Sequence, residues 1–424
     1  MSDASQEVRS PATGFPSYLY THGSWFLAFG LQTVLFPYLV RVVLQESEVR
    51  FGLAQMAMQG PTTLLILVGG FFADRLDGKR TMLFACAMAS VFFLTLFALV
   101  QTDHLNYPLI IAYAIVVGTL GAFMTPARDA LLSQVAPDTS IGGIQKAVAF
   151  ASLTQFGAQI VGMLFAAIAP LVGVANLLLG QAALMASAVF AITRVHPRPA
   201  RKAASREGVN PLVFMASEIK VGIDAVVASP VMSGVMIMAI AMGVFFMGAF
   251  FVILPLIVES YHTADIAAGG ARTQVAAALG IFSLCFWSGS MVSALTMVRL
   301  PPPRYKGRVY LASLACGGTV LMLCGLSLPF WGLCALNFVW GLGGGVAMTL
   351  GRGLMQEHAP EDKRARVLSI FTLGNMGGGP IGAVAYGYLC HAIGAHMAVL
   401  IPGALMLVTV GLVYAFSGLR RLGE

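Results

Sequence analysis

The chain has 424 residues, of which 58% are hydrophobic and only 10% are charged, and its mean hydropathy is +0.83. Water-soluble domains of this length do not have such a composition, so the sequence predicts a membrane protein. The formal net charge of +7 is expected to face an anionic lipid leaflet, and no nucleic-acid partner is expected.

Twelve apolar windows reach the length of about 20 residues that a helix needs to cross a bilayer. In chain order they are 17–43, 51–73, 80–100, 107–130, 142–171, 173–193, 231–260, 273–298, 309–328, 330–354, 367–391 and 397–417. The sequence therefore predicts an all-α membrane protein with twelve transmembrane helices. The divisions at 169–174 and 327–330 are the least clearly marked, because both loops are short and nearly uncharged.

The longest polar segment between windows divides the chain into two halves of six helices. The expected parts are a tail (1–16), a first bundle (17–193), a linker (194–230), a second bundle (231–418) and a final tail (419–424). The linker opens with a basic run that prolines interrupt, and apolar residues then recur at helical spacing. This pattern predicts an amphipathic helix on the inner membrane surface.

Basic residues divide unevenly between the two sides of the predicted membrane. With the amino terminus inside, 22 of the 25 Lys and Arg residues fall on the inner side, and only Arg41, Arg50 and Arg272 fall outside. Because basic loops stay in the cytoplasm, both termini are expected there. The six cysteines lie inside windows without a CxxC pair, and no GxxxxGK[ST] loop occurs, so neither a metal nor another cofactor is expected.

A glycine-started, charged loop, GGFFADRLDGKR, joins the second and third windows. Its glycines allow close approach of a neighbouring helix, and Asp74 can face a helix amino terminus, whose dipole favours a carboxylate. The alternative is a solvated loop that serves only to orient the chain.

The two halves also resemble each other in sequence. MTPAR ends at Arg128 in the fourth window, and MTLGR ends at Arg352 in the tenth. Gly121 and Gly345 match at the same offset. A duplicated six-helix unit explains this repeat, and parallel repeats are a known transporter architecture.

These features resemble the major facilitator superfamily over essentially the whole chain. The loop is similar to the family pattern G-x-x-x-D-R-x-G-R-K, with Asp77 as one extra residue, and the matching positions are Gly70, Asp74, Arg75, Gly78, Lys79 and Arg80. The DRxD variant and the ending TPARDALLSQVAPDTS resemble the bacterial branch of the enterobactin exporter and macrolide efflux pumps. The Pro-Ala-basic ending is also similar to that of the lysophospholipid transporter. The proline motif of drug antiporters in helix five is degenerate here.

The resemblance implies gates at both ends of the bundle. Asp74 would pair with helix eleven near Arg366, and a cytoplasmic charge network would include Arg75, Lys79, Arg80, Arg128, Asp129 and Arg352. For Arg128 and Asp129 the alternative is a surface pair worth under about 1 kcal/mol. At the outer side, Arg41 and Glu259 are expected either to form a gate or to remain separate interfacial charges.

Polar residues are scarce in the helices that the family turns toward its central cavity. The candidates for substrate contact are Gln32, Gln155, Gln159 and Asn375, together with Phe246 in a helix rich in Met and Phe. Amides that only join helices, and aromatic side chains that face lipid, are the alternatives. Three glycines before a proline predict a hinge or a packing point, at Gly377, Gly378, Gly379 and Pro380.

The sequence thus predicts a monomeric secondary transporter, working by alternating access in a bacterial inner membrane. We expect efflux of a small amphiphilic compound such as a siderophore or drug, by antiport if protons are the coupling ion. None of the 18 acidic residues falls near the middle of a window, and His22 is the one histidine proposed for proton coupling, with a snorkelling interfacial position as its alternative. The alternatives are a lysophospholipid flippase and, in another class, a membrane enzyme or a non-transporting receptor. No catalytic residues are identified.

Overall fold

The computed structural model describes residues 14–73, 77–137, 141–198, 211–262, 272–300, 303–361 and 363–422. Within these residues the chain is helical and contains no β-strand. Eleven of the described segments are long and apolar enough to cross a membrane. The 26-residue helix α2 (Glu48–Ala73) occupies the place of the remaining predicted span. The all-α prediction is confirmed.

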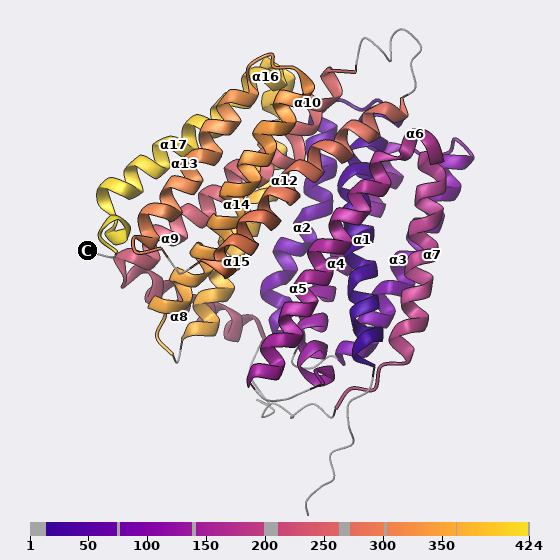
Figure 1. The fold of residues 1–424 in the computed structure, drawn as a ribbon. Coiled ribbons are helices and arrows are strands. Elements are labelled where there is room, and N and C mark those ends of the chain that lie inside the picture. The colour runs from indigo at the N-terminus through magenta and orange to yellow at the C-terminus, as the bar shows by residue number, and fades with distance from the viewer. Residues whose placement is uncertain are drawn as a thin grey trace, which may run out of the picture.

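The first group of helices runs from the amino terminus to Thr193 (Figure 1). Its members are α1 (Phe15–Tyr38), the π-helix η1 (Leu39–Val43), α2, α3 (Gly78–Gln101), α4 (Tyr107–Val135), α5 (Ile141–Ala167), the short α6 (Ala169–Val172) and α7 (Val174–Thr193). Within this first half, α1 packs on α5, α2 on α4 and α3 on α7.

The second group starts after the linker helix α8 (Pro211–Val227). Its members are α9 (Pro230–Ala241), the π-helices η2 (Met242–Met247) and η3 (Ala249–Ile253), α10 (Leu254–Ser260), α12 (Thr273–Arg299), α13 (Lys306–Cys324), α14 (Phe330–His358), α15 (Arg364–Ile393), α16 (Ala395–Ala398), α17 (Leu400–Phe416) and the 3-10 helix η4 (Gly418–Arg421). Within this second half, α12 packs on α14, α13 on α17 and α15 on η2.

Several helices begin at side chains that cap their free backbone N–H groups. Asp77 Oδ1 accepts hydrogen bonds from the backbone nitrogens of Lys79 (2.9 Å) and Arg80 (3.3 Å) at the start of α3. Asn106 caps α4, and Ser229 caps α9 just before a proline. Such capping residues satisfy donors that have no partner within the helix. The extra residue of the charged loop is therefore a helix cap.

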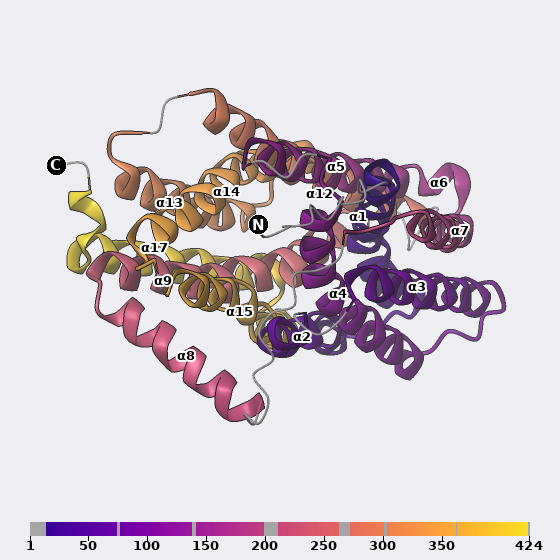
Figure 2. The same ribbon diagram turned by 90° about the horizontal axis from the view of Figure 1, so that it is seen from below.

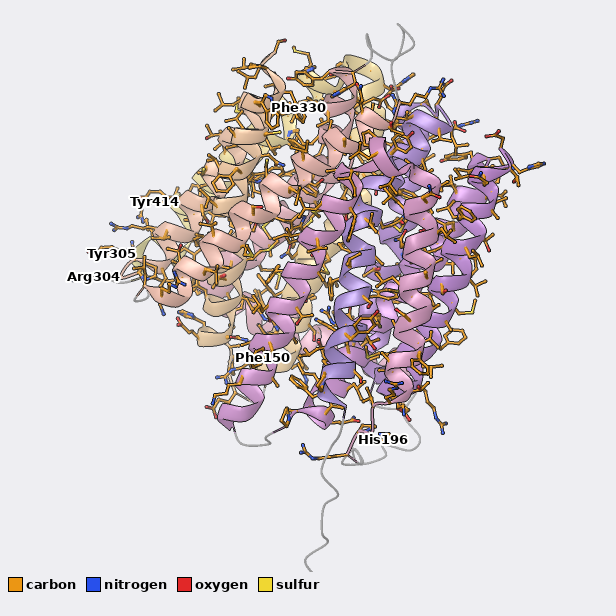
Figure 3. All side chains as sticks on the ribbon, turned by 45° about the vertical axis from the view of Figure 1, so that its right-hand side comes forward. Phe150, His196, Arg304, Tyr305, Phe330 and Tyr414 are labelled. Atoms are coloured by element: carbon orange, nitrogen blue, oxygen red, sulfur yellow. The ribbon has the colours of Figure 1, made fainter. Side chains whose placement is uncertain are left out.

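The bundle has two ends, the Arg41 end and the linker end. The Arg41 end holds α6, α10 and α16, and Phe330 marks it in Figure 3. The linker end holds the start of α1 and the end of α7, near His196 in the same view.

The main contacts between the halves are those of α2 with α15 and of α5 with α12, and α1 and α6 also reach α12. Toward the Arg41 end these helices approach so closely that only glycine fits. A Cβ on Gly52 would lie 2.5 Å from the carbonyl oxygen of Ala383, and a Cβ on Gly280 would lie 3.0 Å from that of Met163. Toward the linker end, by contrast, Ser152 on α5 is exposed. The closest backbone approaches between these helices thus lie toward the Arg41 end.

The predicted linker helix is present as α8, which lies along the edge of the second half (Figure 2). It packs on the start of α15, where a Cβ on Gly222 would lie 3.3 Å from the carbonyl oxygen of Arg366. Val226 is buried, whereas Ile223 and Val227 are exposed. The exposed apolar side chains are compatible with the expected contact of this helix with a membrane surface.

We predict that Asp77→Ala removes a helix cap worth about 1 kcal/mol and lowers the apparent Tm of the purified protein in detergent. Asp77→Asn keeps an oxygen acceptor at the same place and is the matched control. A Tm unchanged in the alanine variant would contradict the capping role.

Candidate functional site

A charged cluster joins the two halves at the Arg41 end. Arg41, in η1, contacts Glu259 of α10 through two hydrogen bonds, Nε to Oε2 at 2.8 Å and Nη2 to Oε1 at 3.2 Å. Arg41 Nη2 also lies 3.1 Å from Glu48 Oε1, and Nη1 donates to the carbonyl oxygen of Glu46. Paired contacts of this kind are among the strongest that arginine makes with a carboxylate.

The cluster continues to helix α15. His391 Nδ1 lies 3.3 Å from Glu48 Oε2, so Glu259, Arg41, Glu48 and His391 form a chain across four elements. The side chains of Arg41 and Glu259 are only 16% and 20% exposed, so water screens their attraction less than at an open surface. The expected partners Arg41 and Glu259 do meet, whereas sequence reasoning missed Glu48 and His391. Their one signal is that they bracket apolar windows at this same end.

The residues expected to form the cytoplasmic gate are only partly visible. Asp74 and Arg75 lie outside the described residues, and for Gly70 the structure describes only its place in α2. Lys79 Nζ donates to the carbonyl oxygen of Thr193 at 3.0 Å, within the first half. A Cβ on Gly78 would lie 2.8 Å from the carbonyl oxygen of Ala127, so this glycine lets α3 approach α4.

The other members of the expected network differ in their surroundings. Arg80 is 89% exposed, and its ion-pair partner among the described residues is Asp77, at 3.6 Å. Arg352 is exposed and lies close enough to Asp129 of the first half for the two charges to interact, and Arg366 lies beside the linker helix. The described contacts of Lys79 and Arg80 are therefore made within their own half.

Arg128 is placed differently from these surface charges. Its side chain is 17% exposed, and its guanidinium lies 4.8 Å from the centre of the Phe26 ring. Arg128 Nη1 lies 3.4 Å from Gln155 Oε1, and Arg128 Nε lies 3.4 Å from Asp129 Oδ1. The Tyr18 hydroxyl donates to the carbonyl oxygen of Arg128 at 3.1 Å. These contacts hold the guanidinium against the inside of the first half.

His22 is buried beside this group, with 3% of its surface exposed. Its Nε2 lies 3.1 Å from the carbonyl oxygen of Ala151, and its ring lies between those of Tyr18 (5.8 Å) and Phe26 (5.0 Å). The expectation that His22 snorkels at the interface is therefore wrong, because neighbouring rings enclose it.

Of the four amides predicted to line the cavity, two contact another side chain, and the other two have a side-chain atom without a hydrogen-bond partner among the described residues. Gln32 Oε1 accepts a hydrogen bond from the Tyr113 hydroxyl at 2.8 Å, so it joins α1 to α4. Gln159 is 1% exposed, and its Nε2 has no hydrogen-bond partner among the described residues. Gln155 contacts Arg128, and the side-chain oxygen of Asn375 finds no partner in the same set of residues.

Aromatic side chains fill the middle of the second half. Phe246 is 7% exposed and lies 5.3 Å from the Trp340 ring, so it packs inside the second half, and its contact with a substrate stays a prediction. Phe286 lies 5.3 Å from Trp340. Trp287, beside it in sequence, reaches 6.4 Å from Phe156 of the first half. Sequence reasoning missed Phe156 and Trp287, because no pattern in one helix shows which residue faces the other half.

The glycines of α15 are packing points. A Cβ on Gly378 would lie 2.4 Å from the Val244 nitrogen of η2, and one on Gly379 would lie 2.7 Å from Gln59 Oε1 of α2. A Cβ on Gly377 would lie in ordinary contact with the Thr63 side chain, at 3.5 Å. The helix passes Pro380 without a break. Close packing is what this conformation shows, and a hinge stays a prediction.

Solved membrane transporters share this arrangement of helices. The nucleoside transporter NupG has a TM-score of 0.75 and 14% identity, and the match covers 95% of this chain and 98% of that one. A proton-dependent oligopeptide transporter has a TM-score of 0.67 and 13% identity, covering 97% and 99%. A POT family transporter in complex with 5-aminolevulinic acid has a TM-score of 0.69 and 12% identity, covering 95% and 96%. At such low identities these likenesses show the fold alone.

The protein is thus a multi-pass membrane transporter of the major facilitator type. Residues 24–423 match the family described as transmembrane secretion effector, and the chain belongs to that family. No curated protein matches the chain.

We predict that Glu259→Gln loosens the Arg41 end, because the exchange removes the carboxylate that holds Arg41 across the halves. The reporter is the native Cys390, which is 4% exposed and adjoins His391. Its labelling by a membrane-impermeant maleimide, measured by mass spectrometry, should rise severalfold. Glu46→Gln is the control, because Glu46 pairs with the exposed Arg50 of the same half. Equal labelling in both variants would rule out a holding role for Glu259.

Proposed function

We propose that the protein exports a small amphiphilic organic compound across a bacterial inner membrane by alternating access. The observation that carries this proposal is the contrast between the two ends. Arg41 and Glu259 join the halves at one end, where glycines also bring α2 and α15 together. At the linker end, Arg128 and Lys79 are held within the first half.

The orientation follows from charge. The start of α1 lies at the linker end, and the linker helix α8 and the basic helix η4 both pack on α9. Basic segments stay in the cytoplasm. In that orientation the tightly packed end faces the outside, and the linker end would open to the cytoplasm, which is where an exporter loads its substrate. The family description, a secretion effector, favours the same direction. In this reading, Arg41 and Glu259 form the outer gate, and the loop of Asp74 and Arg75 forms the inner one.

The proposed substrate is a small amphiphile, and a siderophore or a drug would be an example. The family match supports export, and the chemical identity of the exported compound is our proposal. The structural relatives named for nucleosides and peptides show that this fold also accepts polar substrates. Proton coupling would use acidic groups at helix ends. Glu48 and Glu259 are the candidates, because both contact Arg41 and the contact between Arg41 and Glu259 must break during the cycle.

Transport should stop when the Arg41 end is locked. Glu48→Cys and His391→Cys together, in a Cys390→Ser background, place two thiols where the native side chains lie 3.3 Å apart. A short bismaleimide should then abolish uptake of fluorescent amphiphiles into inside-out vesicles. Each single cysteine variant, treated alike, controls for the modification. Unchanged uptake in the cross-linked protein would refute alternating access at this end.

The inner gate has its own test. Asp74→Asn should lower the vesicle flux at least severalfold, because a neutral amide loses the interaction with a helix amino terminus, while the amount of protein in the membrane stays the same. Wild-type flux in this variant would remove Asp74 from the gate.

A further inference from the structure

The guanidinium of Arg128 is a buried charge whose partners leave it partly unsatisfied. Its Nε has no hydrogen-bond partner among the described residues. The contacts that it does make are long, 3.4 Å to Gln155 Oε1 and 3.4 Å to Asp129 Oδ1, and Asp129 itself is 69% exposed. Arginine carries five N–H donors and no acceptor, so this group has spare capacity for an anion.

A second donor without a partner lies across the seam. The Nε1 of Trp287 is buried and makes no hydrogen bond to any described residue. Its ring lies 6.4 Å from that of Phe156 and 5.7 Å from that of Phe286. An indole N–H, like a guanidinium, can only donate. A buried donor without an acceptor is costly, and a ligand that accepts hydrogen bonds would remove that cost.

One turn of α5 connects the two features. Gln155 and Phe156 follow each other, and successive residues point about 100° apart around a helix. Gln155 therefore faces Arg128 in the first half while Phe156 faces Trp287 in the second. Ser152, one turn nearer the linker end, is exposed. The turn thus lies close to the middle of α5, on the linker side of the closely packed Gly280 contact.

We propose that Arg128, Gln155, Phe156 and Trp287 form the substrate site, and that the substrate is an organic anion with a flat aromatic body. Arg128 binds the anionic group, and Phe156 and Trp287 contact the ring, while Trp287 Nε1 donates to an oxygen on it. This inference rests on the proposed function and specifies the charge and the shape of the substrate. In it, Arg128 binds the substrate and is not part of the cytoplasmic gate.

The internal repeat supplies a matched control. Arg352 occupies the corresponding place in MTLGR, yet its side chain is exposed. Its charge acts on Asp129, next to Arg128, but a solvated guanidinium contributes little to binding a ligand. Only the copy in the first half is therefore suited to hold an anion.

The test measures binding of matched probes to the full-length protein in lipid nanodiscs by calorimetry. Naphthalene-1-sulfonate carries the charge and the ring, naphthalene-1-sulfonamide lacks the charge, 1-naphthyltrimethylammonium reverses it, and octane-1-sulfonate replaces the ring with the alkyl chain typical of a lysolipid. The sulfonate with the ring should bind most tightly. Arg128→Gln should weaken it at least tenfold and leave the sulfonamide unchanged, while Arg352→Gln, which leaves the buried guanidinium in place, should change the binding of the sulfonate by less than twofold.

The ring contact is tested in the same way. Trp287→Leu should weaken naphthalene-1-sulfonate at least fivefold and octane-1-sulfonate by less than twofold, whereas Trp331→Leu, at an exposed tryptophan of the Arg41 end, should change neither. Octane-1-sulfonate binding as tightly as the aromatic sulfonate would overturn the aromatic body and favour a lysolipid. A sulfonamide or ammonium probe that binds as tightly as the sulfonate, or no binding by any probe, would overturn the anion site.

Vesicle flux separates failure of this inference from failure of the proposed function. The two permanently charged naphthalenes cross a bilayer poorly without a carrier. If the protein moves the ammonium probe and rejects the sulfonate, it is a transporter and the anion site is wrong. If it moves neither, export of small amphiphiles is refuted together with the site.

Discussion

The ion pair between Arg41 and Glu259 is the interaction on which this conformation depends, because it joins two bundles that otherwise share few polar contacts. Each side chain is about four-fifths buried. Breaking a fully buried pair costs on the order of 3–5 kcal/mol, and partial exposure lowers that figure. The pair is therefore strong enough to favour one closed end and weak enough to break during a transport cycle.

This pair forms only because the backbones around it approach closely. Gly52 and Gly387 let α2 meet α15, since a Cβ on either would lie about 3 Å or less from the other helix. Among the described residues few hydrogen bonds cross between the halves, such as Gln55 Nε2 to the carbonyl oxygen of Phe251 at 3.0 Å. Small residues on both faces make α15 a surface along which the first half can move without unpacking a core.

Much of this architecture could be predicted from sequence, since the windows and the linker helix follow from apolar length and the placement of charge. The same placement brought Arg41 and Glu259 to one end but left open whether they meet. Contacts that depend on how each helix is rotated could not be predicted, because Phe156 and Trp287 look like any aromatic residues in apolar helices. The π-helices η2 and η3 also give no recognisable signal in the sequence, because all their residues are apolar or small.

The two buried arginines have different places in the proposed cycle. Arg41 lies between the halves, so its contact with Glu259 must break when the outer end opens. Arg128 contacts Phe26 and Gln155 within one half, and rocking of the two bundles leaves those contacts intact. A substrate held by Arg128 would therefore travel with the first half.

Trp287 belongs to the second half, so its contact with Phe156 of the first half must change when the two bundles rock. A ligand that contacts both Phe156 and Trp287 would interact unequally with the arrangements before and after rocking. Binding of the ligand would therefore shift the equilibrium between them.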